Sequence, residues 1–178
     1  EKGKQEYKFL GVGDFKDRLT LAPKDLGCIH QDSLDEEYLL MDNDIVFVRS
    51  NGSRQLVGRS VLVDTQGEKI TYSGFCIRCR LKSDLVNRKY LLGFLTLETT
   101  KQTLTSSGSG CSISNLNQKV LSALNVPIPS LGEQERISTI LDDLREKYQR
   151  LQENHIKNIN LCDVLKQALL RKAFNGEL

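Results

Sequence analysis

The last third of the chain carries apolar residues in the alternating three- and four-residue spacing of a coiled-coil seam. The seam residues are Ile137, Leu141, Leu144, Tyr148, Leu151, Ile159 and Leu165. Ser130 and Glu133 form a capping-box pattern just before the run, and the Asn-Gly pair at 175–176 suits a left-handed helix exit. The pattern predicts one helix from about Leu131 to Ala173, which would extend roughly 60 Å at about 1.5 Å per residue. A helix this long is typical of a spacer or an assembly surface.

The first two thirds of the chain mix strand-like and helix-like patterns. Short apolar or alternating runs predict strands at Tyr7–Val12, Asp44–Arg49, Leu56–Asp64 and Phe75–Leu81. Helical spacing predicts an amphipathic helix over Leu85–Leu104 and a short helix capped by Asn115, followed by a short strand at Val126–Ile128. We therefore expect an α+β protein with a globular domain at residues 1–125 and a helical extension at residues 126–178.

Polar and basic residues gather around the Asn51-Gly52 pair. This pair is a strong signal for a tight hairpin turn, because both residues tolerate positive φ. The turn is surrounded by side chains that hydrogen-bond base edges and phosphates: Arg49, Asn51, Ser53, Arg54, Gln55 and Arg59. A solvated hairpin whose charges protect an edge strand is the alternative that the spacing leaves open.

Basic side chains are concentrated in the middle of the chain, although the net charge is only +2. Residues 49–89 carry nine basic and three acidic side chains, whereas residues 1–48 carry six and eleven. Arg78 and Arg80 belong to the basic part. Such a cluster suits a phosphate-facing surface, because neutralising phosphates releases condensed counterions. Any solvated face can carry similar charges, so the cluster alone does not establish nucleic-acid binding.

The stretch at residues 102–119 consists almost entirely of small neutral residues. It lacks the Gly-Lys-Ser/Thr of a P-loop, which argues against a nucleotide cradle. Its backbone amides and the side chains of Ser107, Ser109 and Asn115 can instead donate to phosphates or base edges along a groove. A flexible linker is the other interpretation.

The sequence contains no catalytic or metal-binding constellation. Cys76 and Cys79 form a C-x-x-C, but the alternation of FCIRCRL predicts a strand whose two sulfurs point to opposite faces. His30 and His155 lie in unrelated contexts and complete no Cys/His site. Five cysteines without framework spacing suit a reducing cytoplasm, and no apolar run approaches the roughly 20 residues of a membrane span. We expect a soluble, cytoplasmic, non-enzymatic protein.

Three motifs connect the chain to a known family. They are DIVFVRSNGSRQLVGRSVLV at 44–63, the Gly/Ser-rich loop followed by NLNQKVL at 115–121, and VPIP with SLGEQERI and a closing AFNGEL at 126–178. In this order, and covering roughly half the chain, they resemble the specificity (S) subunits of type I restriction-modification systems.

The resemblance implies a DNA target-recognition domain at residues 1–125 and a conserved spacer helix at residues 126–178. A full S subunit has two of each, with its helices packed as an antiparallel coiled coil, and reads the two halves of an interrupted double-stranded DNA site. This chain has one of each. We therefore expect either a half-subunit that homodimerises or the carboxyl-terminal half of a longer protein.

The same resemblance assigns the chemistry to partner subunits. S-adenosylmethionine is expected in a methyltransferase subunit, and ATP and magnesium in a restriction subunit of a bacterial or archaeal complex. This chain would hold no cofactor. Two rival functions remain from the residues: a coiled-coil scaffold or adaptor without DNA specificity, and a cryptic Cys/His enzyme.

Overall fold

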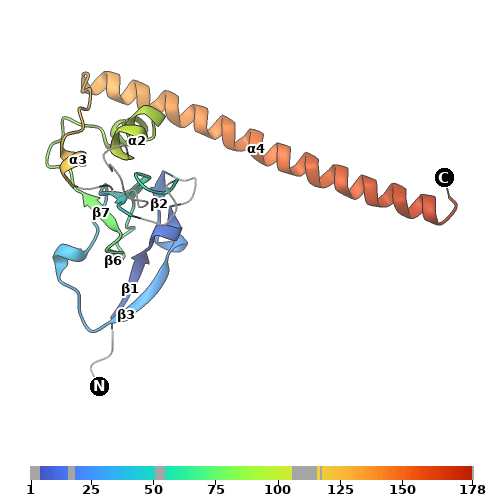
Figure 1. Ribbon diagram of the computed structural model, residues 1–178, viewed down its shortest axis with the longest axis horizontal. Helices are drawn as coiled ribbons and strands as arrows, with labels where there is room; N and C mark the ends of the chain where they lie inside the picture. Colours follow the sequence, from blue (N-terminus) through green and yellow to red (C-terminus); the bar gives the residue numbers. More distant parts are fainter. Residues whose placement is uncertain (1–4, 16–18, 51–54, 106–115, 117, 178) are drawn as a thin grey trace. The chain divides into compact units, whose positions relative to one another are not determined.

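The computed structural model describes residues 5–15, 19–50, 55–105, 116 and 118–177 (Figure 1). The described strands are β1 (Gln5–Leu10), β2 (Thr20–Leu21), β3 (Gly27–Gln31), β4 (Ile45–Val48), β5 (Ser60–Val63), β6 (Ile70–Tyr72) and β7 (Cys76–Cys79). The helices are α1 (Arg88–Leu95), α2 (Glu98–Thr105), α3 (Gln118–Ser122) and α4 (Leu131–Phe174), with short 3-10 turns η1 (Val12–Asp14), η2 (Pro23–Asp25) and η3 (Glu36–Tyr38). The chain divides into two compact units, Glu1–Glu135 and Arg136–Leu178.

The strands of the first unit form two sheets. The larger sheet has the order β2-β5-β4-β7, and the smaller has the order β3-β1-β6. Strand β4 pairs antiparallel with both neighbours, so that Ile45 lies opposite Leu62 of β5 and Cys79 of β7. Strand β7 is therefore an edge of the larger sheet, and β2 is the opposite edge.

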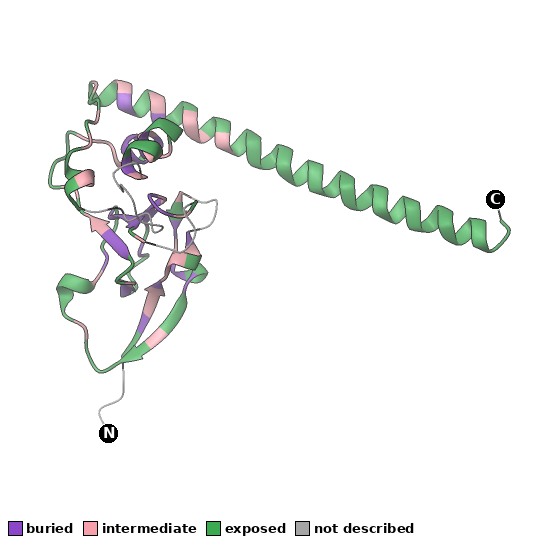
Figure 2. Ribbon diagram, in the orientation of Figure 1, coloured by how far each residue is buried: buried purple, intermediate pink, exposed green. Residues whose placement is uncertain are grey.

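Strand β4 is buried on both of its faces, which explains why its sequence is an unbroken apolar run rather than an alternation. Val46 and Val48 belong to a core cluster with residues of β1, β5 and β6. Ile45 and Phe47 belong to a second cluster with Leu62, Ile77 and the apolar residues of α1 and α2. Figure 2 shows that buried segments gather in the first unit, whereas most of α4 is exposed.

The junction between α1 and the start of α4 is held by a buried glutamine. The side chain of Gln134 is fully buried; its Oε1 accepts from the Asn87 amide at 2.8 Å, and its Nε2 donates to the carbonyls of Leu85 and Pro129 at 3.0 and 2.8 Å. The Asn87 side chain in turn caps α1 by accepting from the amides of Lys89 and Tyr90. These contacts all lie within the first unit.

The expected α+β fold with a long carboxyl-terminal helix is confirmed, and several local expectations were wrong. The helix expected over Leu85–Leu104 is two helices, because the backbone tightens at Thr96 and Leu97, whose amides donate to the Gly93 and Phe94 carbonyls three residues back. The predicted strand at Val126–Ile128 does not form, since Pro127 and Pro129 offer no amide to a ladder. The functional division at 125/126 stays a prediction.

The other strand boundaries also shift. The run at Leu56–Asp64 begins with a turn and becomes a strand only at Ser60, because Gly58 adopts a φ of 80°. Strands β2, β3 and β6 were not predicted; each is short or exposed, and their pairing with distant partners defines them. The helix expected to be capped by Asn115 appears as α3, and Asn115 itself lies outside the described residues.

We predict that Gln134→Ala lowers the free energy of unfolding of the first unit by about 3 kcal/mol. The substitution leaves one buried donor, the Asn87 amide, and two buried acceptors, the Leu85 and Pro129 carbonyls, without hydrogen bonds. Urea unfolding followed by near-ultraviolet circular dichroism of the tyrosines measures the change. Gln167→Ala is the matched control, since Gln167 is exposed on the same helix and should cost less than about 0.5 kcal/mol. Equal effects of the two substitutions would contradict the role given to Gln134.

Candidate nucleic-acid interface

The β4–β5 connection carries most of the residues predicted to contact DNA. The antiparallel pairing on either side of this connection is confirmed: Phe47 lies opposite Ser60, the Val48 amide donates to the Arg59 carbonyl at 2.9 Å, and the Gly58 amide donates to the Val48 carbonyl at 3.0 Å. The tight turn predicted at Asn51-Gly52 stays a prediction. Asn51, Ser53 and Arg54 lie outside the described residues. The structure therefore fixes where this loop leaves and rejoins the sheet.

Arg49 is the first residue of this connection and is held through its backbone on both sides. Its amide donates to the Phe75 carbonyl at 2.7 Å, and its carbonyl accepts from the Leu116 amide at 2.8 Å. Its side chain is exposed. The fixed backbone and the exposed guanidinium make Arg49 suited to an external ligand.

Arg59 and Gln55 lie on the returning arm of the same loop. Arg59 Nε donates to the Gln55 carbonyl at 3.2 Å, and Nη1 donates to the Phe15 carbonyl at 3.2 Å. The Arg59 guanidinium thus supports the loop from within, while the Gln55 side chain is exposed.

The Gly/Ser-rich stretch begins and ends beside this hairpin. Ser107, Ser109 and Asn115 lie outside the described residues, but the flanking Leu104 and Leu116 are both fully buried in the second core cluster. Leu116 donates to Arg49, and a Cβ placed on Gly58 would lie 3.7 and 3.8 Å from side-chain atoms of Thr105 and Leu104. The structure therefore brings together the ends of the two loops that the sequence predicts to contact DNA.

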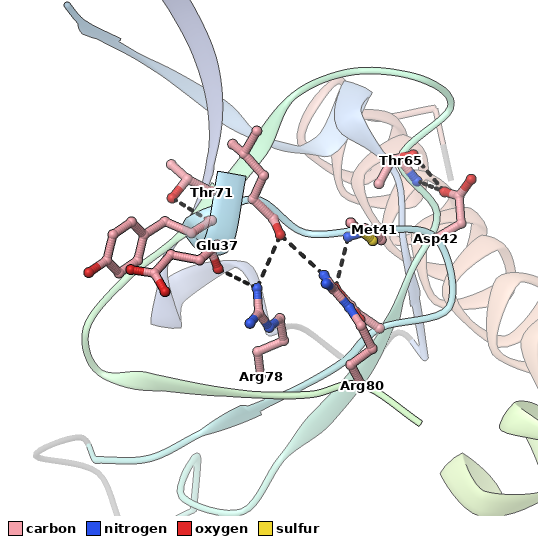
Figure 3. A network of polar contacts seen from close by, with 10 residues as sticks. Glu37, Met41, Asp42, Thr65, Thr71, Arg78 and Arg80 are labelled. Carbon is pink, nitrogen blue, oxygen red and sulfur yellow. Dashed lines mark hydrogen bonds and ion pairs between the residues drawn. The ribbon is translucent and has the colours of Figure 1, made fainter. Parts of the chain in front are cut away.

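Arg78 of β7 and Arg80, which directly follows β7, point toward the segment around η3, and both form hydrogen bonds within the chain (Figure 3). Arg80 Nε and Nη2 donate to the two carboxylate oxygens of Asp44 at 2.8 and 2.7 Å, and Asp44 is only 1% exposed. The hydrogen bond to Asp44 raises the pKa of Arg80 above its usual value. Arg80 therefore neutralises a buried carboxylate.

Arg78 differs from Arg80 in having carbonyl partners. Its Nη1 donates to the backbone carbonyls of Glu37 and Leu39, and its guanidinium carbon lies 6.0 Å from the centre of the Tyr72 ring. Carbonyls orient a guanidinium without cancelling its charge. Among the residues that the structure describes, Arg78 has no carboxylate partner.

Three residues near this surface were not predicted: Tyr72, Phe75 and Gln118. Phe75 is 62% exposed on the turn between β6 and β7, a turn tightened by the bond from the Phe75 amide to the Ser73 hydroxyl. Tyr72 and Gln118 line a hollow together with Arg49 and Arg78. Only tertiary structure brings β6 and α3 to this place, so local sequence patterns give no signal for them.

The structure confirms the structural interpretation of the C-x-x-C pair. Cys76 is buried in the first core cluster, and Cys79 packs against the second, so the two thiols face opposite sides of the sheet. Burial raises the pKa of Cys76 to about 12, which keeps it a neutral thiol. Within the described ranges, no group of three His, Cys, Asp or Glu residues is arranged to hold a metal ion.

The second unit contributes an exposed apolar seam. Helix α4 runs without a break to Phe174, and all of its residues from Leu151 onward are exposed (Figure 2). Its predicted seam residues Leu144, Tyr148, Leu151, Ile159 and Leu165 are between 51% and 67% exposed, whereas Ile137 and Leu141 are partly buried. No helix in the described part of the chain has the length and apolar character needed to cross a membrane.

Comparison with known proteins decides the family. The type I restriction modification DNA specificity domain matches residues 1–161, nine tenths of the chain. The chain belongs to this family. It is 30% identical, over 97% of its length, to the specificity subunit of the type I restriction enzyme StySPI of Salmonella potsdam, and 26% identical over 90% to that of EcoKI of Escherichia coli K12. It spans 38% and 32% of the lengths of these two relatives.

Solved structures share the fold of this specificity-domain chain. A chain from a study of complex assembly and conformational transition of the type I R-M system covers all of it with a TM-score of 0.74 at 22% identity. The HsdS subunit of Thermoanaerobacter tengcongensis covers 84% of it with a TM-score of 0.64 at 14% identity. The present chain corresponds to 40% and 38% of those two chains. The family predicted from the three sequence motifs is confirmed.

In this specificity domain, we predict that Arg80→Met lowers the free energy of unfolding by about 2 kcal/mol, because it leaves the Asp44 carboxylate buried without its cation. The same substitution in an Asp44→Asn background should cost less than half as much, since a neutral amide needs no counter-charge. Urea unfolding of the four proteins in this cycle measures the coupling. Additive effects would show that the ion pair contributes nothing to stability.

Proposed function

We propose that this chain is the DNA-recognition element of a type I restriction-modification complex. Its first unit would bind a specific duplex sequence and direct methyltransferase and restriction subunits to a bipartite target. The observation that carries the proposal is the convergence of the β4–β5 loop and the Gly/Ser-rich stretch, joined by the hydrogen bond from the Leu116 amide to the Arg49 carbonyl.

Two loops that leave a rigid scaffold at one place are a typical arrangement for recognition. The scaffold here is the doubly buried strand β4, and the sequences of both loops carry small polar or basic side chains. We propose that bases and phosphates are contacted by residues of these loops: Arg49, Asn51, Ser53, Arg54, Gln55, Arg59, Ser107, Ser109 and Asn115. Arg78 of β7 and Arg80, which directly follows β7, are further candidates. Because Arg80 is paired with Asp44, we expect it to contribute less to DNA affinity than Arg78 does.

The partners follow from the relatives. The curated relatives are specificity subunits of type I restriction enzymes, and one solved structure comes from a study of type I complex assembly. We propose that this chain is non-catalytic and assembles with a methyltransferase subunit that uses S-adenosylmethionine and with a restriction subunit that uses ATP and magnesium. The exposed seam of α4 would pair with a second long helix, from another copy or from a longer subunit.

A scaffold or adaptor without DNA specificity is the second candidate, and the exposed apolar face of α4 favours it. The two functions differ in how DNA binding responds to salt. A scaffold predicts no systematic dependence, whereas phosphate contacts predict that the logarithm of affinity falls linearly with the logarithm of salt concentration.

We predict that the purified chain selects one duplex motif from a randomised library and binds it more tightly than a scrambled duplex. Arg54→Ala should weaken binding to the selected duplex by about 1–3 kcal/mol, with little effect on the scrambled one, if Arg54 contacts a base. Fluorescence anisotropy on both duplexes measures this. Lys24→Ala removes the same charge near β2, at the opposite edge of the sheet from β7, and serves as the matched control.

Given S-adenosylmethionine, ATP and magnesium, the same preparation should leave the selected duplex unmethylated and uncut. A library selection that yields no motif would contradict the proposed specificity. Turnover that is abolished by a substitution in this chain would contradict the non-catalytic role.

We predict that Leu144→Asp together with Leu151→Asp dissociates a dimer of this chain while the first unit stays folded. Each leucine is more than half exposed in the single chain, and covering one stabilises an interface by about 1.5–3 kcal/mol. Analytical ultracentrifugation measures the assembly, and circular dichroism follows the strands. The control, Gln149→Asp with Asn160→Asp, places the same charges off the predicted seam and should leave the dimer intact. A wild-type chain that is monomeric at high micromolar concentration would exclude the homodimer.

A further inference from the structure

A polar hollow of about 480 Å³ opens beside the edge strand β7, within the first unit. Its lining comes from four separate parts of the chain: Arg49 at the end of β4, Tyr72 of β6, Cys76, Ile77 and Arg78 of β7, and Gln118 of α3. Arg49 and Arg78 both belong to the basic middle of the sequence, but no local pattern predicts that they share one hollow.

Two guanidinium groups contribute uncancelled positive charge to this hollow. Arg78 is oriented by the carbonyls of Glu37 and Leu39, which occupy Nη1 and leave Nε and Nη2 without a protein acceptor among the described residues. Arg49 is exposed, and within the part of the chain that the structure describes its side chain forms no hydrogen bond or ion pair. Arg80, two residues from Arg78, shows the contrast, since Asp44 neutralises it.

The concave shape of the hollow favours an anionic group that protrudes from the surface of a larger ligand. An element that reads base edges must project into a groove, whereas a hollow receives a group that projects from the DNA. The backbone phosphate is such a group, and guanidinium groups match its oxygens with paired donors. The exposed Gln118 amide adds a neutral donor to the lining.

We propose that this hollow binds a phosphodiester of the DNA backbone, with Arg49, Arg78 and Gln118 as the donors. The proposal rests on the function proposed above and adds an anchoring role to it. The contact between the hollow and the phosphodiester is independent of sequence, because every nucleotide carries the same phosphate. It would fix the register of the duplex, because Arg49 begins the β4–β5 loop whose other residues are proposed to read bases.

The test compares three variants of the full chain on a random-sequence duplex, across a series of sodium chloride concentrations. Arg49→Gln should weaken binding roughly tenfold at low salt and reduce the slope of log affinity against log salt by about 1, as expected for one lost phosphate contact. Gln118→Ala should weaken binding severalfold and leave the slope unchanged, because it removes a neutral donor. Lys24→Gln lies in η2, which follows the opposite edge strand β2 in the chain, and should change neither quantity appreciably.

The outcomes separate this proposal from the function on which it rests. The phosphate site would be overturned if Arg49→Gln reduced the slope of log affinity against log salt no more than Lys24→Gln does. It would also be overturned if Arg49→Gln weakened binding only to a selected duplex. Both results would leave sequence specificity intact. A wild-type chain that prefers no sequence but still loses affinity through Arg49→Gln would retain the site and exclude specific recognition. If inorganic phosphate binds the wild type in calorimetry at constant ionic strength while Arg49→Gln keeps its full DNA affinity, the hollow is a free-phosphate site and the proposal is wrong.

Discussion

The burial of β4 on both faces is the constraint on which the rest of the first unit depends. Its four residues alternate between two core clusters, so the strand must be covered by residues of β1 and β6 on one face and by residues of α1 and α2 on the other. It is also hydrogen-bonded on both edges, to β5 and β7. A one-residue slip in the pairing of β4 would turn each of its side chains toward the other core cluster. Arg49 directly follows this strand. The proposed recognition surface therefore starts from the least adjustable strand of the fold.

The arginines of the first unit show how one residue type takes different roles within a single domain. Arg80 is committed to the buried carboxylate of Asp44, Arg59 supports its own loop through the Phe15 carbonyl, and Arg78 is oriented by carbonyls that leave its charge intact. Breaking a buried pair is costly, whereas an uncompensated guanidinium is available to an anion. The basic charge of residues 49–89 is thus divided between stabilising the domain and attracting a ligand, and the structure distinguishes the two by the partner of each side chain.

The sequence predicted the elements that local patterns define and missed those that distant contacts define. The heptad spacing predicted α4 almost to its ends, and the apolar runs on either side of Asn51-Gly52 predicted that β4 and β5 pair antiparallel. The tight turn itself stays a prediction, because Asn51 and Gly52 lie outside the described residues. The short strands β2 and β6 have no local signature, because pairing with β5 and β1 defines them. The hollow was unpredictable for the same reason, since Tyr72 and Gln118 meet Arg49 only in the folded chain. Charge alone also could not separate Arg78 from Arg80, whose difference lies in the neighbouring Asp44.

Hydrogen–deuterium exchange of the full chain with and without a saturating duplex tests the central claim most directly. We expect DNA to slow exchange in residues 49–59, in the turn at residues 73–75 and in residues 106–119, and to leave the paired strands β1 and β3 unchanged. Those two strands belong to the other sheet and carry none of the proposed contacts. Protection confined to β1 and β3, or to α4, with none near Arg49, would contradict the assignment of the recognition surface to the loops beside β4 and β7.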